Sequence, residues 1–435
     1  MPKSSAMNAP EPLTVHICGK PAGVLDHHRG ELRFAYSDDY AADPAAVPLS
    51  VSMPLTGPPV VGRRISGWLD GLLPTNQLVR RRWAARHGAL SHSAFDVLGT
   101  AVGLDLPGAV QTFSYGAAAG LHERPSGIDW LSTAQLEGFV DQLVREKNWR
   151  REGTRSAWSL AGAQSKTALV RDGDRWGEPW GTNASTHILK PSMPGLQDQA
   201  INEHLCLAAA RHCGLAAARS QPLRIGSHSV IAVTRDDRPT SPNGTVARAH
   251  QEDLHQACGE PDIGIYQSDF GGHPISRFAR LFAEHSAEPD TDKRRFLDAL
   301  VFNWLVCNLD GHAKNYGLQL AHTGHRLAPL YDIWSMQPYE PDLISSHTMA
   351  MSALPDRRIL AADNPAAWRA AAAAIGIAPA EGPLRAAALA AALAGAFTRA
   401  ADELPEDVRQ APIVHTLTTA MTQRSQHCLT ALAAN

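Results

Sequence analysis

One short stretch of the chain gathers residue types that can carry out phosphoryl transfer. The stretch NLDGHAKN, residues 308–315, directly follows the apolar run FLDALVFNWLVC, which we expect to be a buried helix. In a phosphoryl-transfer catalytic loop, an Asp accepts the proton of the attacking hydroxyl, and an Asn five positions later holds Mg²⁺. Asp310 and Asn315 have this spacing. For Asp310 taken alone, a polar helix end is the simpler interpretation.

Three further charged residues could complete such a site. Asp332 follows Tyr331 in LAPLYDIWS, where we expect it to end a strand and to offer a carboxylate to Mg²⁺. Lys190 ends the apolar strand HILK and could place one positive charge on nucleotide phosphates. Glu203, in the helix that follows, could pair with Lys190. The ordinary alternatives are a strand-edge lysine in water and a solvated helical glutamate.

A segment of small residues lies before Lys190 and is the candidate phosphate loop. It comprises Ala161, Gly162, Ala163, Gln164, Ser165 and Lys166. Glycine and alanine let main-chain amides come close to phosphate oxygens. The segment does not read GxGxxG, so a plain hairpin turn is the simpler interpretation of it alone. The ordered set of loop, strand lysine, Asp–Asn pair and later Asp is far harder to obtain by chance.

The overall charge excludes a chain that coats nucleic acid by charge alone. The 435 residues contain 40 Lys and Arg against 43 Asp and Glu, which gives a net charge of −3. A local basic patch stays open as an alternative. The run VRRRWAAR, residues 79–86, could contact DNA phosphates, although a solvated helix face is the simpler interpretation.

The cysteines and the apolar segments indicate a cytoplasmic protein. None of the six cysteines forms a CxxC pair, so buried thiols in a reducing compartment are expected rather than disulfides or a metal site. The start MPKSSAMNAPEP has no apolar run typical of a signal peptide. No stretch of about 18 apolar residues suggests a membrane span.

Periodicity and turn residues divide the chain into elements. A strand–turn–strand at 13–25 and a strand at 31–40 are expected to precede a helical region from 67 toward 88 and a helix at 94–103. A helix at 133–146 follows. SLAGAQSKTALVRDGDRW, 159–176, is expected to form two strands around a small-residue turn, followed by a strand at 186–191, a helix at 200–215 and a strand at 229–238. Helices then dominate, including an alanine-rich tail at 365–401.

A β-rich segment followed by a helical one predicts an α+β, bilobal protein-kinase-like fold. We expect a β-rich N-lobe, an all-helical C-lobe and a small N-terminal α+β subdomain. The predicted boundaries are a disordered tail at 1–12, the subdomain at 13–115, the N-lobe with its phosphate loop at 116–245, and the C-lobe with the catalytic and metal-binding loops at 246–435.

The chain resembles the HipA family of serine/threonine-protein kinases, the toxins of type II toxin–antitoxin pairs. The resemblance spans residues 13–340 and no single motif carries it. The matching motifs are GVL, PLSVSMPL, GWLDGLLP, GLDLPGAV, SLAGAQSK, HILKPS, INEHLCLAAARHCGL, RAHQEDLHQACG, NLDGHAKN and LAPLYDIWS.

The resemblance implies a role for each matching position. It makes Asp310 the catalytic base, Asn315 and Asp332 the metal ligands, and Lys190 the lysine on the ATP phosphates. It makes residues 161–166 the phosphate loop. The further nucleotide contacts it implies are His312, Ala313, Lys314, Asn315, Tyr331, Asp332 and the hinge residues Thr234, Arg235, Asp236 and Asp237. The hinge departs from the family, which has an acidic and an aromatic residue at positions 234 and 236, so stacking on the adenine is left open.

The resemblance also implies regulation, cofactors and partners. Ser159 matches the serine whose autophosphorylation ejects the phosphate loop, with Ser156 and Ser165 as alternatives. The implied cofactors are ATP and Mg²⁺. The implied partners are a HipB-like helix-turn-helix antitoxin, operator DNA through the antitoxin complex, and an aminoacyl-tRNA synthetase substrate of the glutamyl-tRNA synthetase class. No membrane partner is expected.

Two other functions remain open at this point. A small-molecule phosphotransferase of the aminoglycoside type shares the Asp–x₄–Asn loop, but the N-terminal domain and the HQED segment argue against it. A non-catalytic co-repressor subunit would not need Asp310, Asn315 and Asp332 to be intact.

Overall fold

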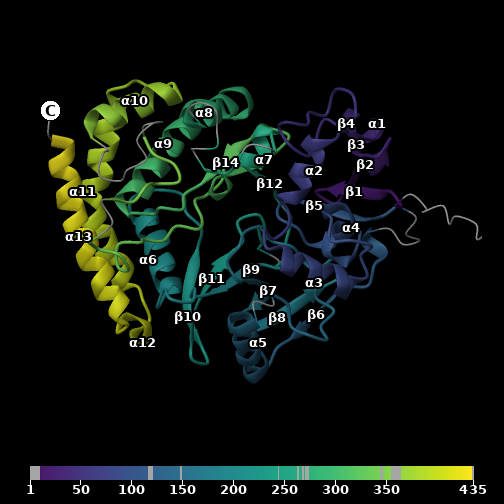
Figure 1. The fold of residues 1–435 in the computed structure, drawn as a ribbon, viewed down its shortest axis with the longest axis horizontal. Coiled ribbons are helices and arrows are strands. Elements are labelled where there is room, and N and C mark those ends of the chain that lie inside the picture. The colour runs from purple at the N-terminus through teal and green to yellow at the C-terminus, as the bar shows by residue number, and fades with distance from the viewer. Residues whose placement is uncertain are drawn as a thin grey trace, which may run out of the picture.

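The computed structural model describes residues 10–115, 121–146, 149–242, 244–261, 264–266, 269, 274–342, 346–353 and 364–433. The tail expected to be disordered, residues 1–12, lies mostly outside this part of the chain. Figure 1 shows three regions: an N-terminal domain, a second sheet below it, and a helical lobe that ends in α13. The predicted domain boundaries remain predictions.

The N-terminal domain is built on a five-stranded antiparallel sheet with the strand order β4-β3-β2-β1-β5. The three strands predicted first are confirmed as β1, β2 and β3. The predicted helical region at 67–88 is two helices, α2 and α3, because residues 71–76 between them include Pro74 and the N-cap Asn76. The elements are β1 Leu13–Ile17, β2 Lys20–His28, β3 Glu31–Tyr36, α1 Asp38–Ala42, β4 Val60–Val61, α2 Arg63–Asp70, α3 Gln77–His87, α4 Ala94–Leu98, η1 Ala101–Leu104 and β5 Val110–Ser114.

The second sheet has six strands in the order β10-β11-β9-β7-β8-β6, and α6 packs against β10 and β11. Of the two strands expected around residues 161–166, the one after the turn is confirmed as β7, which begins at Thr167. The one before the turn is wrong, because residues 158–161 are irregular. Main-chain groups of that segment bond to the N-terminal domain instead of to a neighbouring strand. The elements are η2 Leu121–Glu123, β6 Gly127–Trp130, α5 Thr133–Glu146, β7 Thr167–Asp172, β8 Arg175–Trp180, β9 His187–Pro191, α6 Gln199–His212, β10 Ser220–Ile225 and β11 His228–Thr234.

The C-terminal lobe is mostly helical, but the expectation that it is all-helical is wrong. A three-stranded sheet, β12-β13-β14, lies within it. The sequence did not predict strand β12, because its residues HQED are all polar or charged. In the structure His250 and Glu252 are nevertheless buried against the N-terminal domain. The elements are β12 His250–Asp253, α7 Leu254–Cys258, α8 Pro274–His285, α9 Pro289–Leu305, η4 Ala313–Asn315, β13 Gly317–Leu320, β14 Arg326–Leu327, α10 Pro365–Ile375, α11 Glu381–Asp402, α12 Glu406–Arg409 and α13 Pro412–Ala433.

One described helix, α11, is long and apolar enough to cross a membrane by length and composition alone. In the structure it packs beside α13 along one edge of the helical lobe, and it also contacts α6, α9 and α10 (Figure 1). Its residues Leu389, Leu393 and Phe397 belong to the main hydrophobic core. The helix therefore buries an apolar face against its neighbours, as a core helix does.

Candidate active site

The catalytic-loop candidate follows α9 and is braced by buried amides. The Asn308 side-chain Nδ2 donates to Asn303 Oδ1 at 2.9 Å, and Asn303 Nδ2 donates to the Tyr316 hydroxyl at 2.8 Å. Within the loop, Asn315 Nδ2 donates to the main-chain oxygen of Asp310 at 2.8 Å. This bond holds the two ends of the loop together. It uses the Nδ2 of Asn315, so the Oδ1 of the same amide is not part of it. Asp310 remains accessible to solvent, although neighbouring atoms crowd its carboxyl group.

Lys190 joins two lobes of the molecule. Its Nζ lies 2.8 Å from Glu203 Oε1 on α6 and 2.8 Å from Asp332 Oδ1. Glu203 is 0% exposed, so the alternative of a solvated helical glutamate is wrong and its pairing with Lys190 is confirmed. The three charged groups come from β9, α6 and the segment after β14. The ion pair between a strand lysine and a helix glutamate is one that active protein kinases require.

The charges at this point keep one another ionised. Burial by itself would raise the pKa of Asp332, but Lys190 and Lys166 outweigh burial and hold the pKa at about 2. Burial would lower the pKa of Lys190, but Asp332 and Glu203 outweigh it and raise the pKa above the ordinary value. Asp332 is therefore a carboxylate and Lys190 an ammonium group at neutral pH.

Asp310 has the opposite shift. Desolvation by the surrounding atoms raises the pKa of its carboxyl, the nearby Asp332 carboxylate raises it further, and His312 opposes both. The Asp332 carboxylate contributes to this shift, so the two acidic groups are electrostatic neighbours. A carboxylate with a raised pKa is a better proton acceptor than an ordinary aspartate.

Asp332 does not end a strand, contrary to expectation. Between β14 and Asp332, Leu330 forms a bridge with Ala217, and Asp332 itself has a left-handed backbone with a φ of 58°. This uncommon conformation is supported on its N-terminal side, where the hydroxyl of Tyr331 donates to the main-chain oxygen of Lys314 at 2.8 Å. Tyr331 therefore ties the segment carrying Asp332 to the catalytic loop.

The phosphate-loop candidate lies next to these charges. The Lys166 Nζ donates to the Ala161 oxygen at 2.7 Å, so the side chain spans its own loop. Gly162 has a φ of 101°, and a Cβ there would lie 2.6 Å from Lys166 Nζ, so position 162 needs a glycine. Gln164 Nε2 donates to the Pro191 oxygen at 3.2 Å, which links the loop to the end of β9. Ala163 is exposed, and Ser165 is half-buried.

The predicted hinge residues point to alternate sides. Arg235 and Asp237 are buried and pair with each other at 2.8 Å, facing the N-terminal domain. Thr234 and Asp236 are half-buried on the other side. The N–H groups of Thr234 and Arg235 already donate to the oxygens of Arg219 and Thr186, so these two cannot bind an adenine base without rearrangement.

The three candidate phosphorylation sites differ in exposure. Ser159 is 0% exposed, and its Oγ donates to the Leu72 oxygen at 2.6 Å. Ser156 is 1% exposed, and its Oγ has no partner among the described residues. Ser165 is the least buried of the three. Phosphorylation of Ser159 or Ser156 therefore requires the segment to leave its present position.

The basic run on α3 is largely occupied within the protein. Arg80 is buried and pairs with Asp70 at 2.5 Å, and Arg86 donates to the main-chain oxygens of Arg151 and Thr154. Arg81 and Arg82 are exposed. Arg80 and Arg86 are therefore not available to DNA, and only Arg81 and Arg82 fit the solvated helix face of the simpler interpretation.

The donor set fits a divalent cation only together with a nucleotide. Among the described residues, no group of three or more His, Cys, Asp or Glu side chains could hold a metal ion. Asn315 Oδ1 and the second oxygen of Asp332 are hard ligands, and Mg²⁺ is usually held by one or two carboxylates together with substrate phosphates. Two buried atoms that face this region, Glu203 Oε2 and His312 Nδ1, have no partner among the described residues. The residues present therefore fit a magnesium nucleotide.

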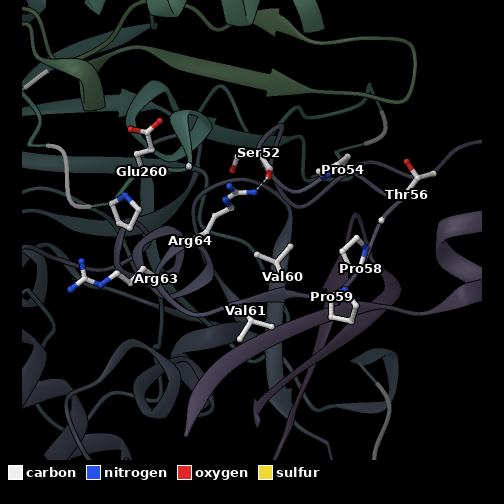
Figure 2. A pocket seen from close by; sticks show the side chains of 13 residues that line it. Ser52, Pro54, Thr56, Pro58, Pro59, Val60, Val61, Arg63, Arg64 and Glu260 are labelled. Atoms are coloured by element: carbon white, nitrogen blue, oxygen red, sulfur yellow. Dashed lines mark hydrogen bonds between the residues drawn. The ribbon is translucent and has the colours of Figure 1, made fainter. Parts of the chain in front are cut away.

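A cavity of about 630 Å³ lies elsewhere, at the junction of the N-terminal domain and the helical lobe. Figure 2 shows that its lining residues run from Ser52 to Arg64 and continue at Glu260, just after α7. None of the predicted site residues lines it. It therefore has no part in the site around Lys190.

The HQED segment has a role that the sequence did not reveal. His250 Nε2 lies 2.9 Å from the Leu49 oxygen, and Glu252 accepts from the Val51 N–H and from Trp68 Nε1, both at 2.9 Å. These bonds fasten the N-terminal domain to β12. Charged letters within a family motif were the only signal, and they suggested a surface rather than a buried interface.

Comparisons with known proteins find two matching family models and several similar proteins. Residues 13–113 match the family model of the HipA N-terminal domain, and residues 158–403 match that of the HipA-like C-terminal domain. The chain is 34% identical over 348 residues to “Putative kinase Y4mE” of Sinorhizobium fredii, which covers 78% of this chain and 80% of that protein. It is 29% identical over 341 residues to “Serine/threonine-protein kinase toxin HipA” of Shewanella oneidensis, covering 73% of this chain and 76% of that protein.

A solved structure matches the whole fold. The complex of HipA, HipB and operator DNA from Shewanella oneidensis contains a chain that superposes with a TM-score of 0.78 at 25% identity, covering 95% of this chain and 96% of that chain. The predicted kinase-like fold class is therefore confirmed.

Proposed function

The chain belongs to the HipA family of protein kinases, and we propose that it is an ATP- and Mg²⁺-dependent serine/threonine kinase that acts as the toxin of a toxin–antitoxin module. One observation carries the proposal. The Nζ of Lys190 lies 2.8 Å from both the Glu203 and the Asp332 carboxylates, and the Tyr331 hydroxyl ties the segment of Asp332 to the catalytic loop at 2.8 Å. Residues far apart in the chain thus meet as phosphoryl transfer requires.

Each residue has a distinct task in this proposal. Asp310 accepts the proton of the incoming serine or threonine hydroxyl, helped by its raised pKa. Lys190 and Lys166 neutralise phosphate oxygens from two sides. Asn315 and Asp332 would hold the magnesium ion, while Glu203 keeps Lys190 in place. ATP, when bound, supplies the phosphoryl group, and residues 161–166 cover its phosphates. The nucleotide contacts at His312, Ala313, Lys314, Tyr331 and residues 234–237 belong to the same proposal.

The substrate and partners follow from the family. We propose that an aminoacyl-tRNA synthetase of the glutamyl-tRNA synthetase class is phosphorylated, which would inhibit translation. The solved complex from Shewanella oneidensis contains HipA, HipB and operator DNA, and this supports a HipB-like antitoxin and operator DNA as partners of this chain. The proposed target is cytoplasmic, and we place this protein in the same compartment.

Autophosphorylation of Ser159 is part of the proposal. The Oγ now donates to a main-chain oxygen, and a phosphate cannot stay there because the two oxygens would repel each other. Modification would therefore drive the segment out of its buried position and switch the kinase off.

One experiment tests the proposal against its alternatives. The purified protein is incubated with labelled ATP, Mg²⁺ and a bacterial lysate, beside the variants Asp310→Ala and Asp332→Ala. We expect one labelled band of synthetase size with the wild-type protein, and a loss of about 10²–10⁴-fold in transfer for Asp310→Ala. Asp332→Ala should also abolish transfer, because the metal loses its carboxylate ligand.

Other outcomes would contradict the proposal. Full activity of Asp332→Ala would mean that the metal site lies elsewhere. Label on an added aminoglycoside, and on no protein, would identify a small-molecule phosphotransferase. The absence of any transfer, together with operator binding only in the presence of the antitoxin, would identify a co-repressor subunit.

A further inference from the structure

The phosphate loop is held in place from outside the kinase lobes. The Oγ of Ser159 donates to the Leu72 oxygen at 2.6 Å, and the N–H of Thr75 donates to the Gly162 oxygen at 3.1 Å. Pro74 and Gly162 form a parallel bridge. Leu72, Pro74 and Thr75 all lie between α2 and α3 of the N-terminal domain. The loop therefore depends on this domain for its main-chain hydrogen bonds.

Side-chain packing supports the same attachment. The ring of Trp158, next to Ser159, meets the ring of Trp83 on α3 edge to face, with 5.6 Å between the ring centres. Arg150 lies over the Trp83 ring at 3.9 Å. Trp83 and Trp158 are each 1% exposed, so the start of the loop is locked into an aromatic cluster shared with the N-terminal domain.

Asp105 is the residue at which these contacts meet. Its main-chain oxygen accepts from the Ser159 N–H at 2.8 Å. Its carboxylate accepts from the N–H and Oγ of Ser185 at 3.0 and 2.7 Å, from Arg238 at 3.0 Å, and from Arg248 at 2.6 Å. Asp105 is 1% exposed. One buried aspartate of the N-terminal domain thus bonds to four segments of the rest of the chain.

Three of these segments surround the proposed nucleotide site. Ser159 begins the phosphate loop, Ser185 precedes β9 with Lys190, and Arg238 follows the hinge at 234–237. Arg235 of the hinge also donates to Ser185 Oγ at 2.8 Å. Asp105 bonds to all three segments, through its main-chain oxygen to Ser159 and through its carboxylate to Ser185 and Arg238, so their relative positions depend on Asp105.

The charge balance makes the aspartate essential to the cluster. Burial would raise the pKa of Asp105, but Arg248, Arg238 and Arg235 outweigh burial and hold the pKa well below its usual range. The described cluster contains these three arginines and two carboxylates, Asp105 and Asp237. Removal of the Asp105 charge would leave three buried cations with one counter-ion, which is strongly unfavourable.

We propose that the N-terminal domain is the built-in positioning element of the nucleotide site, and that Asp105 is its central positioning residue. Asp105 acts through the phosphate loop, Ser185 and the hinge, and it touches no substrate. The proposal rests on the assignment of the nucleotide site made above. It also gives the N-terminal domain a task inside the kinase, in addition to any contact with a partner.

The variant Asp105→Asn tests the proposal because it keeps the side-chain shape and the main-chain oxygen. We measure ATP affinity by calorimetry, the KM for ATP and kcat in the lysate assay, and hydrogen exchange by mass spectrometry. We expect ATP to bind on the order of 10–100-fold more weakly, with a matching rise in KM. Amides in residues 158–166 and 183–190 should exchange faster, while those of α11 and α13 keep the wild-type rate.

Asp298→Asn is the matched control. Asp298 is also a buried carboxylate, 7% exposed, and it accepts from Arg385 Nε at 2.6 Å within the helical lobe. Its loss should lower the melting temperature and leave ATP affinity and exchange at residues 158–166 unchanged. If Asp105→Asn changes these two readouts no more than Asp298→Asn does, Asp105 has only a structural role and the proposal is wrong.

A second variant covers the case in which Asp105→Asn does not fold. Arg248→Lys keeps the charge but loses the paired geometry with Asp105 and the bond to the Thr182 oxygen. We expect weaker ATP binding and faster exchange at residues 158–166, both to a smaller extent than in Asp105→Asn. Wild-type values of both would overturn the proposal. ATP affinity and exchange need no protein substrate, so a failure of the proposed kinase activity would be seen separately, in the transfer assay.

Discussion

At the scale of the residue, two lysines share one site and their pKa values move apart. Burial and the neighbouring Lys190 lower the pKa of Lys166 to about 8. Lys190 lies against two carboxylates, which raise its pKa despite burial. Lys190 is therefore a permanent cation, whereas Lys166 can lose its proton close to neutral pH. A buried lysine with a lowered pKa beside other charged groups is typical of a functional site.

The pH dependence of ATP binding should follow Lys166. If the charged form binds phosphate, affinity should fall above pH 8 by up to about tenfold per pH unit. Lys166→Arg should remove this fall, because arginine stays charged. Calorimetry between pH 7 and pH 9.5 measures both proteins.

Unfolding does not explain such a fall. The pKa of Lys166 in the folded protein lies below the ordinary lysine value of 10.5, so the unfolded chain binds more protons between about pH 8 and 10.5. The contribution of this group to stability therefore increases as pH rises through that window. Identical pH profiles for the wild type and Lys166→Arg would show that Lys166 does not bind the phosphates.

At the scale of the element, α6 places both acidic partners of Lys190. Glu203 contacts Lys190 directly. The neighbouring Asn202 donates from Nδ2 to the Ser335 oxygen at 2.8 Å and accepts the Ser335 N–H at 2.9 Å. One turn of a helix thus fixes Glu203 and the segment that carries Asp332. The helix can do this because it is buried from Gln199 to Ala210, between β11 on one side and α11 on the other.

Asn202→Ala should therefore affect both stability and catalysis. Two buried main-chain groups of Ser335 would lose their partner, at a cost of roughly 2–5 kcal/mol in the free energy of unfolding. Phosphoryl transfer should fall by at least about tenfold, because Asp332 is no longer held. Denaturant unfolding and the lysate assay measure the two effects.

Leu207→Ala on the same helix is the control for stability. Leu207 is 0% exposed, and its truncation should cost about 2–5 kcal/mol with little effect on transfer by the folded protein. Equal losses of transfer in the two variants would mean that Asn202 only stabilises the helix.

At the scale of the whole molecule, the N-terminal domain is attached by buried ionisable groups. Burial raises the pKa of Glu252 to about 7, although the Val51 N–H, Ser50 and Trp68 all oppose the shift. Burial lowers the pKa of His250, on the same strand, to about 4. Both residues face the N-terminal domain, so the attachment of this domain is sensitive to pH between these values.

The two groups act with opposite signs. The raised pKa of Glu252 means that its contribution to stability is present below about pH 4.5 and is lost as pH rises through 7. The lowered pKa of His250 means that its contribution is gained as pH rises from about 4 to 6.5. The two effects partly cancel in the wild-type protein, and a substitution is needed to separate them.

Glu252→Gln should reveal the Glu252 contribution. The neutral amide does not titrate, so the stability of the variant relative to the wild type should improve by about 2–3 kcal/mol between pH 4.5 and pH 7.5. Denaturant unfolding of both proteins across this range gives the difference, in which the other titrating groups cancel. A stability difference that stays constant across this pH range would show that burial does not raise the pKa of Glu252 in the folded protein.

The sequence by itself predicted the chemistry of the site and determined most of the local structure. The Asp310–Asn315 spacing, the lysine at the end of β9 and the helices and strands of the N-terminal domain depend on residue type and short-range periodicity, which are present in the linear pattern. The sequence missed the strand β12 and wrongly predicted strands before residue 161 and before Asp332. In all three places, buried polar groups bond to distant segments of the chain.

Only the tertiary structure decided which partners the buried charges have. Lys190 and Asp332 are 142 positions apart, and Asp105 meets Arg248 across 143 positions. Nothing in the local pattern distinguishes a solvated aspartate from one that holds three arginines. The distinction arises because burial removes water from a charged group, and the group must then find its counter-ions wherever packing brings them.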